Sequence, residues 1–292
     1  MIESIRNLVR ANILEIVGGG SGPPAAFLTP KGDPGLFGPN SIAWRVHADF
    51  ISMMIGGISS LSLQALHPKA LAGVWDHSTF RQDLKGRLGR TAFFIAATTY
   101  GPKEMALNII EKVNRIHQHV QGTDETGSSY KASDPHLIKW VHLTETYSFL
   151  KSYQKYCSPS LNPAEEDQYF KEMRLLGELL GASDLPETLR ETEQAIMSYQ
   201  SELRYGDRAK TIIELLTHFP SSIQLKPFTK LITSAGFANL PAWALKLIDK
   251  PLPNYFENLF LMTGVNLVAI PVREALKNGV AAHSYKRVYG LA

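Results

Sequence analysis

Three polar side chains, Arg87, Thr91 and His117, are spaced so that they could meet on two neighbouring helices. Arg87 and Thr91 are four residues apart and therefore share one face of a helix. Gly101 and Pro102 end that helix and permit a tight turn, after which the next helix runs back antiparallel. Arg87 then lies about 21 Å before the turn and His117 about 22 Å after it, along the two helix axes. Because these heights agree, the spacing predicts one site.

The imidazole of His117 could be a ligand for a metal ion or for haem iron. Arg87 and Thr91 would then contact an oxygen-containing substrate or acid groups. The alternative is a structural histidine near a helix end, five residues before Gly122, that gains only from the helix dipole. Spacing leaves both interpretations open.

A second candidate pair is His142 and Glu145, which are three residues apart and share a helix face. This spacing recurs in carboxylate metal sites of helix bundles. A di-metal site needs the pair twice, however, and the sequence shows no second copy. The alternative is a buried His142 that forms a hydrogen bond with Glu145.

Asp76 and His77 stand at a helix boundary, and His77 precedes Arg87 by ten residues. They could act as a distal acid and base if the following loop folds over the same site, or they could cap the helix. No Gly-x-Ser-x-Gly, His-Glu-x-x-His or protein-kinase signature occurs, so hydrolase, zinc-peptidase and kinase chemistry have no local support.

The elements that must position these residues are helices. Residues 1–35 read as an amphipathic helix and a glycine-rich linker, and residues 36–292 as the domain. Because no two-residue alternation is sustained, the predicted fold is all-α: a single globular helical domain with a buried pocket between helices. Residues 219–253 are richer in proline and loop residues. Helices are predicted over 40–64, 66–75, 86–100, 102–121, 134–157, 162–180, 186–203, 206–218 and 254–280.

Composition restricts the function classes. The chain has 292 residues and a net charge of +3, which is too weak to indicate a nucleic-acid partner. Cys157 is the single cysteine, so an internal disulfide is excluded. Residues 2–17 carry four charges and do not resemble a signal peptide, which favours a cytoplasmic protein.

Two uncharged apolar runs, Phe50 to Leu66 and Asn258 to Val272, could raise the question of a membrane. Both are short for a helix that spans a bilayer. We therefore expect buried core helices in both, and no transmembrane segment. Peripheral contact with a membrane surface stays open.

Several segments, taken in order, resemble the MpaB/rubber-oxygenase family, which includes the latex clearing protein. The resemblance covers roughly residues 35–200. The segments are Leu36-Phe37-Gly38-Pro39, Trp44-Arg45-Val46-His47, Leu63-Gln64-Ala65-Leu66-His67-Pro68, Asp76-His77-Ser78-x-Phe80, Gly86-Arg87-Leu88-Gly89-Arg90-Thr91, His117-x-x-Val120-x-Gly122, Tyr130-x-Ala132 with Asp134-Pro135, and Trp140-Val141-His142, with Leu185-Pro186 downstream.

The resemblance implies an all-helical fold that holds haem b and uses dioxygen to cleave an alkene. The proximal iron ligand of the family falls on His117, and its distal arginine and threonine fall on Arg87 and Thr91. Arg90 stands where the family places a lysine, and Asp76 is the nearest candidate for the distal carboxylate. Further candidate contacts to the cofactor are Arg115 and His142.

The sequence departs from the family beside the proximal histidine. Rubber oxygenases have arginines three residues before and four after it, where this chain has Asn114 and Gln121. Such arginines are natural partners for haem propionates. We expect a small lipophilic substrate that reacts with dioxygen. The alternatives are a haem-free binding or interaction protein that keeps the fold, and a non-haem iron enzyme using His117, His142 and Glu145.

Overall fold

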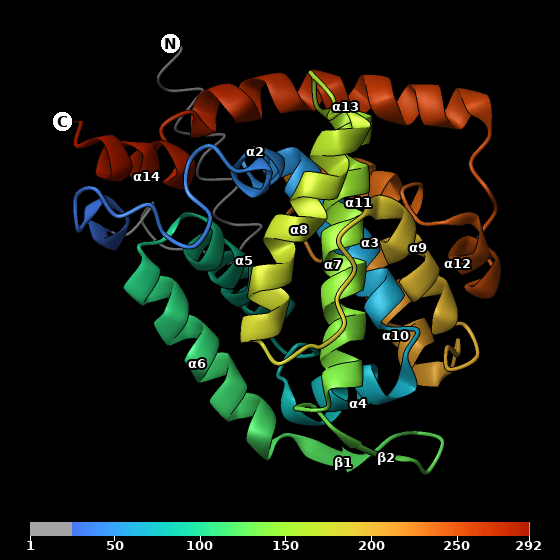
Figure 1. Ribbon diagram of the computed structural model, residues 1–292. Coiled ribbons are helices and arrows are strands. Elements are labelled where there is room, and N and C mark those ends of the chain that lie inside the picture. Colours follow the sequence, from blue (N-terminus) through green and yellow to red (C-terminus); the bar gives the residue numbers. More distant parts are fainter. Residues whose placement is uncertain (1–24, 292) are drawn as a thin grey trace.

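The computed structural model describes residues 25–291 and consists almost entirely of helices (Figure 1). Its centre is formed by α3 (Phe50–Gln64) and α7 (Pro135–Tyr156), which pack along each other. Gly56 permits this close approach, because a Cβ at that position would lie 2.7 Å from the ring of Phe149. The predicted all-α fold is confirmed.

The predicted helix over 40–64 is two helices, α2 (Ile42–His47) and α3, separated at Ala48 and Asp49. Asp49 begins the second helix, since its carboxylate accepts a 2.8 Å hydrogen bond from the Ser52 main-chain N–H. The same carboxylate accepts a hydrogen bond from Arg273 at 2.5 Å. A capping residue with two partners therefore breaks a run that reads as continuous.

Helices α8 (Pro163–Leu179) and α9 (Leu189–Ser198) cover α7. Asn162 and Glu165 form a capping box at the start of α8, as the Asn-Pro signal in the sequence predicts. Gly177 brings α8 close to its neighbours: a Cβ there would lie 2.4 Å from Leu185 and 2.9 Å from His142. This glycine is required by packing rather than by backbone conformation.

Helices α5 (Leu84–Tyr100) and α6 (Lys103–His119) form the predicted antiparallel pair on one flank of the molecule (Figure 1). Two short strands follow, β1 (Gln121–Thr123) and β2 (Ser129–Lys131), with Gly122 opposite Tyr130. This small hairpin lies against α4 (Pro68–His77). It is an addition that the sequence did not predict.

The proline-rich stretch 219–253 contains more structure than expected. After α10 (Asp207–Thr217) come a short 3₁₀ turn, η2 (Ile223–Leu225), and the helices α11 (Lys226–Phe237) and α12 (Ala242–Leu247). Helix α11 packs on α3, where a Cβ at Gly236 would lie 2.5 Å from Ile58. The central layer therefore has a third helix that the sequence analysis left out.

The run Asn258 to Val272 was expected to be a buried core helix, and this expectation is wrong. The run lies in α13 (Tyr255–Leu276), which is mostly exposed. Its buried stripe, which includes Val265, Ala269 and Val272, packs on α11 and α3. Large apolar side chains on its other faces remain exposed, and Phe256 is 77% exposed. Among the described residues it is the one continuous helix long and apolar enough to cross a membrane (Figure 1). By contrast, α3 is largely buried, as predicted.

The first and last described elements, η1 (Ala25–Leu28) and α14 (Val280–Tyr289), pack on each other. The fully buried Arg287 donates to the main-chain oxygens of Phe27 at 3.1 Å and Asp33 at 2.9 Å, and its own carbonyl accepts from Gly32 N–H. The predicted first helix and glycine-rich stretch lie outside the described residues.

Candidate functional site

Arg87 occupies the first turn of α5, and the loop that follows α4 folds onto it. Its Nη1 donates a 2.9 Å hydrogen bond to the hydroxyl of Ser78. Burial lowers the pKa of Arg87, and the neighbouring charge of Arg90 adds to this. No carboxylate in the described part of the chain pairs with this guanidinium. A half-buried cation whose partner is one hydroxyl can still bind an anionic or oxygen-containing group.

Thr91 lies one turn further along α5 and is exposed. Its hydroxyl donates to the main-chain oxygen of Arg87 at 3.2 Å. The hydroxyl oxygen keeps its acceptor capacity. The two residues therefore share one helix face, as their spacing predicts.

His117 lies near the end of α6, the helix that packs against α5. Its Nδ1 is buried and has no hydrogen-bond partner. Burial lowers the pKa of His117, so its imidazole is neutral at pH 7 and keeps a free lone pair. A buried imidazole nitrogen without a partner is costly unless something binds it, and the feature fits a ligand for metal or haem iron.

Asn114 connects α6 to α8 in place of a basic side chain. Its Nδ2 donates a 2.9 Å hydrogen bond to the carbonyl of Leu179, at the end of α8. Its Oδ1 is buried and makes no hydrogen bond. Asn114 therefore joins α6 to α8 through a neutral side chain, at the position where rubber oxygenases have a charged arginine.

Asp76 and His77 are directed to other partners. Asp76 accepts from the Tyr130 hydroxyl at 3.2 Å and lies 3.3 Å from the Arg208 guanidinium. His77 Nε2 lies 3.3 Å from the carbonyl of Gln121. The structure thus ties both residues to the β-hairpin and α10, and the contact with Arg87 from this segment comes from Ser78. In the Asp76-His77-Ser78 motif, the third residue is therefore the one that contacts Arg87.

The other two predicted cofactor-binding arginines are exposed and already paired. Arg90 lies 3.5 Å from Asp83, and Arg115 lies 3.8 Å from Glu111 one turn earlier on α6. Exposed pairs of this kind contribute little to stability and can exchange partners. Neither residue is held in a fixed position for a cofactor.

His142 and Glu145 lie on the inner part of α7. Burial lowers the pKa of His142 to about 4, and a hydrogen bond with the main chain of Met173 partly opposes this. Burial raises the pKa of Glu145 to about 7. His142 therefore bonds to α8 rather than to Glu145, and Glu145 is a carboxyl group able to gain or lose a proton near neutral pH.

A buried chain of polar side chains, which the candidate residues above do not include, is centred on His47. His47 Nδ1 is 2.8 Å from the Thr99 hydroxyl, and its Nε2 is 2.9 Å from the Tyr169 hydroxyl. Burial lowers the pKa of His47 to about 3, so the ring is neutral. It joins α2, α5 and α8. In the sequence, His47 ends the Trp-Arg-Val-His segment of the family resemblance.

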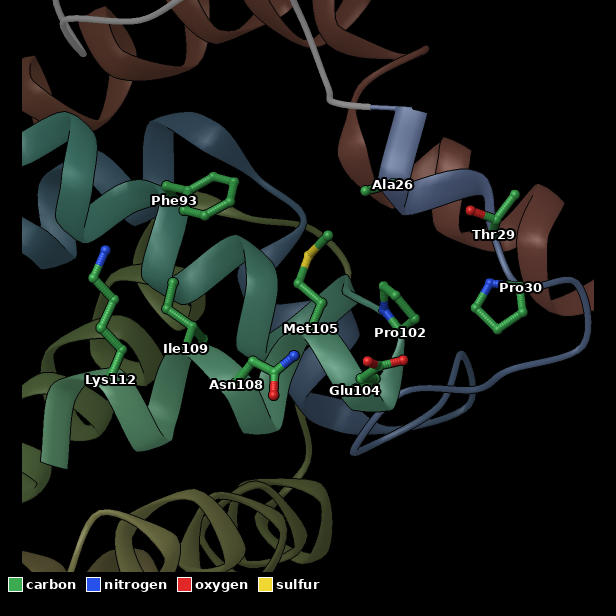
Figure 2. A pocket seen from close by; sticks show the side chains of 10 residues that line it. All are labelled: Ala26, Thr29, Pro30, Phe93, Pro102, Glu104, Met105, Asn108, Ile109 and Lys112. Atoms are coloured by element: carbon green, nitrogen blue, oxygen red, sulfur yellow. The ribbon is translucent and has the colours of Figure 1, made fainter. Parts of the chain in front are cut away.

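Two open hollows lie elsewhere on the surface. One, of about 580 Å³, runs between η1 and the outer sides of α5 and α6, where Phe93, Met105 and Lys112 line it (Figure 2). The other, of about 830 Å³, lies beside the start of α13. It combines apolar walls, such as Phe237 and Phe260, with lysines. Neither hollow is lined by Arg87, Thr91 or His117.

Metal-ligand geometry occurs at a different place from the one predicted. Among residues 25–291, the group whose ligand atoms lie within 4.8 Å of one another is His67, His136 and Glu202. His117, His142 and Glu145 do not form such a group among the described residues. The non-haem iron alternative on those three residues stays a prediction without this support.

The donor set present fits a haem group: one imidazole would hold the iron, and one guanidinium would contact an acid group. His117 offers a half-buried, neutral imidazole whose buried Nδ1 has no partner, and Arg87 offers a guanidinium without a carboxylate partner among the described residues. Comparison with known proteins shows the family of the chain. The family of the "ER-bound oxygenase mpaB/B'/Rubber oxygenase, catalytic domain" matches residues 44–265.

No curated protein and no solved structure matches the chain. The family match extends from α2 into α13 and so includes every element that positions Arg87 and His117. It also includes α11, which lies beyond the reach of the sequence resemblance. A match over that much of the chain establishes that this protein belongs to the MpaB/rubber-oxygenase catalytic-domain family.

Proposed function

We propose that this protein is a haem b-dependent oxygenase that uses dioxygen to cleave or oxygenate a small lipophilic alkene. The observation that carries the proposal is the buried, unpartnered Nδ1 of His117 on the helix that faces Arg87. Haem b, when bound, would supply an iron centre that activates dioxygen. His117 would hold the iron, and Arg87 would bind a propionate or an oxygen atom.

The residues around this site have separable roles. Arg87 would donate hydrogen bonds to developing negative charge, which is worth most where water is excluded. Ser78 would orient the guanidinium through its 2.9 Å contact. Thr91 would offer a hydroxyl on the same helix face. Asp76 and His77 are weaker choices for the acid and base, because each already has partners on the hairpin.

Glu145 is a better supported proton carrier than Asp76. Its pKa of about 7 allows the carboxyl oxygen to accept a proton and release it at neutral pH. It lies one turn before Phe149 on α7, and Phe149 packs in the cluster that includes Phe94 and Ile110. Glu145 is therefore on the helix that shares a hydrophobic cluster with side chains of α5 and α6. An allylic C–H of the substrate is the proton source that we propose.

The substrate is proposed to be lipophilic and to arrive from a membrane surface. Helix α13 exposes Tyr255, Phe256 and Phe260 beside the larger hollow, whose rim carries Lys226, Lys230 and Lys250. Apolar side chains next to lysines suit the interface of a membrane with anionic lipids. One face of α13 packs on α11 and α3, and the other faces are exposed. We therefore propose that α13 lies on a membrane surface rather than crossing the membrane. We place the protein in the cytoplasm, at such a surface.

The visible absorption spectrum of the full chain tests the proposal. The protein is expressed with a haem precursor supplied, and its iron is quantified. We expect a strong Soret band that is lost in His117→Ala and retained in His119→Ala, an exposed histidine two residues away. A protein without a Soret band, or a band that survives in His117→Ala, contradicts the proposal. Iron without the band indicates non-haem chemistry.

A further inference from the structure

A cluster of two histidines and one glutamate lies at the start of α7, near Pro135. His67 precedes α4, His136 is in the first turn of α7, and Glu202 is in the turn after α9. His136 Nε2 lies 2.9 Å from Glu202 Oε1, and His67 Nε2 lies 3.3 Å from Glu202 Oε2. Three segments that are far apart in sequence therefore meet at one carboxylate.

Contacts beside the cluster hold these three segments in place. The Arg204 N–H donates to the carbonyl of Leu66 at 2.7 Å, which fixes the turn beside His67. The Tyr199 hydroxyl donates to the carbonyl of His136 at 2.9 Å, and the rings of these two residues stack at 4.4 Å. The three side chains are thus presented by a rigid frame, as ligands in a built metal site are.

His67 is the member that an ordinary hydrogen-bond network leaves unexplained. It is only 1% exposed, and neither of its ring nitrogens makes a hydrogen bond. Its Nε2 lies close to Glu202, yet not in a direction suited to a hydrogen bond. Leaving two buried polar atoms unsatisfied is costly. A metal ion bound through the Nε2 lone pair would remove part of that cost.

The donor set and spacing suit a divalent transition metal. Two imidazole nitrogens and one carboxylate oxygen are the protein ligands of many zinc sites, with metal–ligand distances of about 2.0–2.2 Å. A tetrahedral centre then places neighbouring ligand atoms about 3.3 Å apart. Glu202 Oε2 lies 3.3 Å from His67 Nε2 and 3.1 Å from His136 Nε2, and all three ligand atoms lie within 4.8 Å of one another. The partly exposed His136 and Glu202 leave one side open for water as a fourth ligand.

We propose that His67, His136 and Glu202 form a Zn²⁺-type site that fastens the start of α4, the start of α7 and the α9–α10 turn together. The site is separate from His117 and does not depend on the proposed haem. Because a metal that binds the folded state raises its stability, the site would strengthen the frame that carries α7.

Calorimetric titration of the full chain with Zn²⁺, after chelator treatment and removal of any affinity tag, tests this inference. We expect one equivalent to bind and the melting temperature to rise with Zn²⁺. His136→Ala and Glu202→Gln should each weaken binding at least about tenfold. His119→Ala and His117→Ala should leave it unchanged. Co²⁺ should give the visible absorption bands of a tetrahedral site.

Both test variants alter partly exposed side chains, and circular dichroism checks that they fold. If either is unfolded, His136→Gln and Glu202→Ala replace them in the same titration. Absence of one-to-one Zn²⁺ binding to the unmodified chain overturns the inference. So does unchanged affinity in the folded His136 and Glu202 variants, or loss of binding in His117→Ala, which would place the metal at α6.

Discussion

Arg87 Nη1 and the Ser78 hydroxyl are 2.9 Å apart, although one belongs to α5 and the other ends α4. This contact closes the loop between the two helices over the first turn of α5. The guanidinium is consequently held by one neutral partner and remains available for a second, anionic one. The loop therefore contributes to the site through a serine rather than through the neighbouring Asp76 or His77.

Replacing Arg87 should affect the reaction more than the fold. In Arg87→Gln we expect dioxygen-dependent turnover to fall by about 10²–10³, because a donor aimed at developing charge is lost. Oxygen consumption with a lipophilic alkene measures the effect. Arg115→Gln is the matched control, since Arg115 is exposed on α6 and its ion pair within residues 25–291 is the exposed one with Glu111. Equal turnover in Arg87→Gln and the unmodified protein would remove Arg87 from the site.

Glu145 should make stability fall as the pH rises. Its pKa is raised from 4.5 to about 7, so between these values the folded state binds a proton that the unfolded state has lost. The contribution of Glu145 to the unfolding free energy should therefore decrease from pH 4.5 to 7, by up to about 3 kcal/mol. In urea unfolding, the difference in stability between the unmodified protein and Glu145→Gln should shrink by this amount over that range.

The histidines of the core act in the opposite direction and provide an internal comparison. The pKa values of His47 and His142 are lowered to about 3 and about 4, so stability is lost as the pH falls below 6.5. That acid limb should persist in Glu145→Gln. Glu104→Gln, an exposed change on α6, should leave both limbs intact. If the pH dependence of stability near neutral pH is the same in Glu145→Gln as in the unmodified protein, the raised pKa of Glu145 is contradicted.

Gly177 and Gly57 make a matched pair of helical glycines. Gly177→Ala should destabilise the protein by about 1–3 kcal/mol, because the new Cβ would overlap Leu185 and crowd His142. At Gly57 the Cβ would meet nothing within 4 Å, so Gly57→Ala should stabilise α3 by about 0.5–1 kcal/mol. Urea unfolding measures both. The same sign of change at both positions would refute the α7–α8 contact.

Helix α13 should bind membranes through its exposed apolar side chains. The double variant Phe256→Ser with Phe260→Ser removes two rings that are 77% and 73% exposed. We expect it to lose most of its sedimentation with vesicles containing anionic lipid. Leu175→Ser, which changes an exposed leucine of α8, should bind as the unmodified protein does. Equal sedimentation of all three proteins would argue against a membrane-facing α13.

Helices whose ends carry local signals were predictable from sequence. Asp134 accepts from the His136 N–H at 2.9 Å and starts α7, and Asn162 starts α8, both directly before a proline. Arg87 and Thr91 share a face because helical spacing requires it. Such features depend on interactions within a few residues of one another.

The features that escaped prediction depend on distant parts of the chain. Helix α11 lies in a stretch interrupted by prolines, and its packing on α3 outweighs those local signals. Exposure of α13 depends on which neighbours reach it, which its composition does not reveal. The meeting of His67, His136 and Glu202 depends on the tertiary arrangement of three turns. Sequence spacing has no information about any of these.

The clamp formed by Arg287 restricts the order in which the chain can complete its fold during synthesis. The main-chain oxygens of Phe27 and Asp33 have this guanidinium as a partner, and it lies within the last described helix. The beginning of the described chain leaves the ribosome first, but these two carbonyls gain their Arg287 partner only after the last described helix has emerged. Removing α14 would therefore leave both carbonyls without this partner and uncover the side of Phe27 that packs on α14.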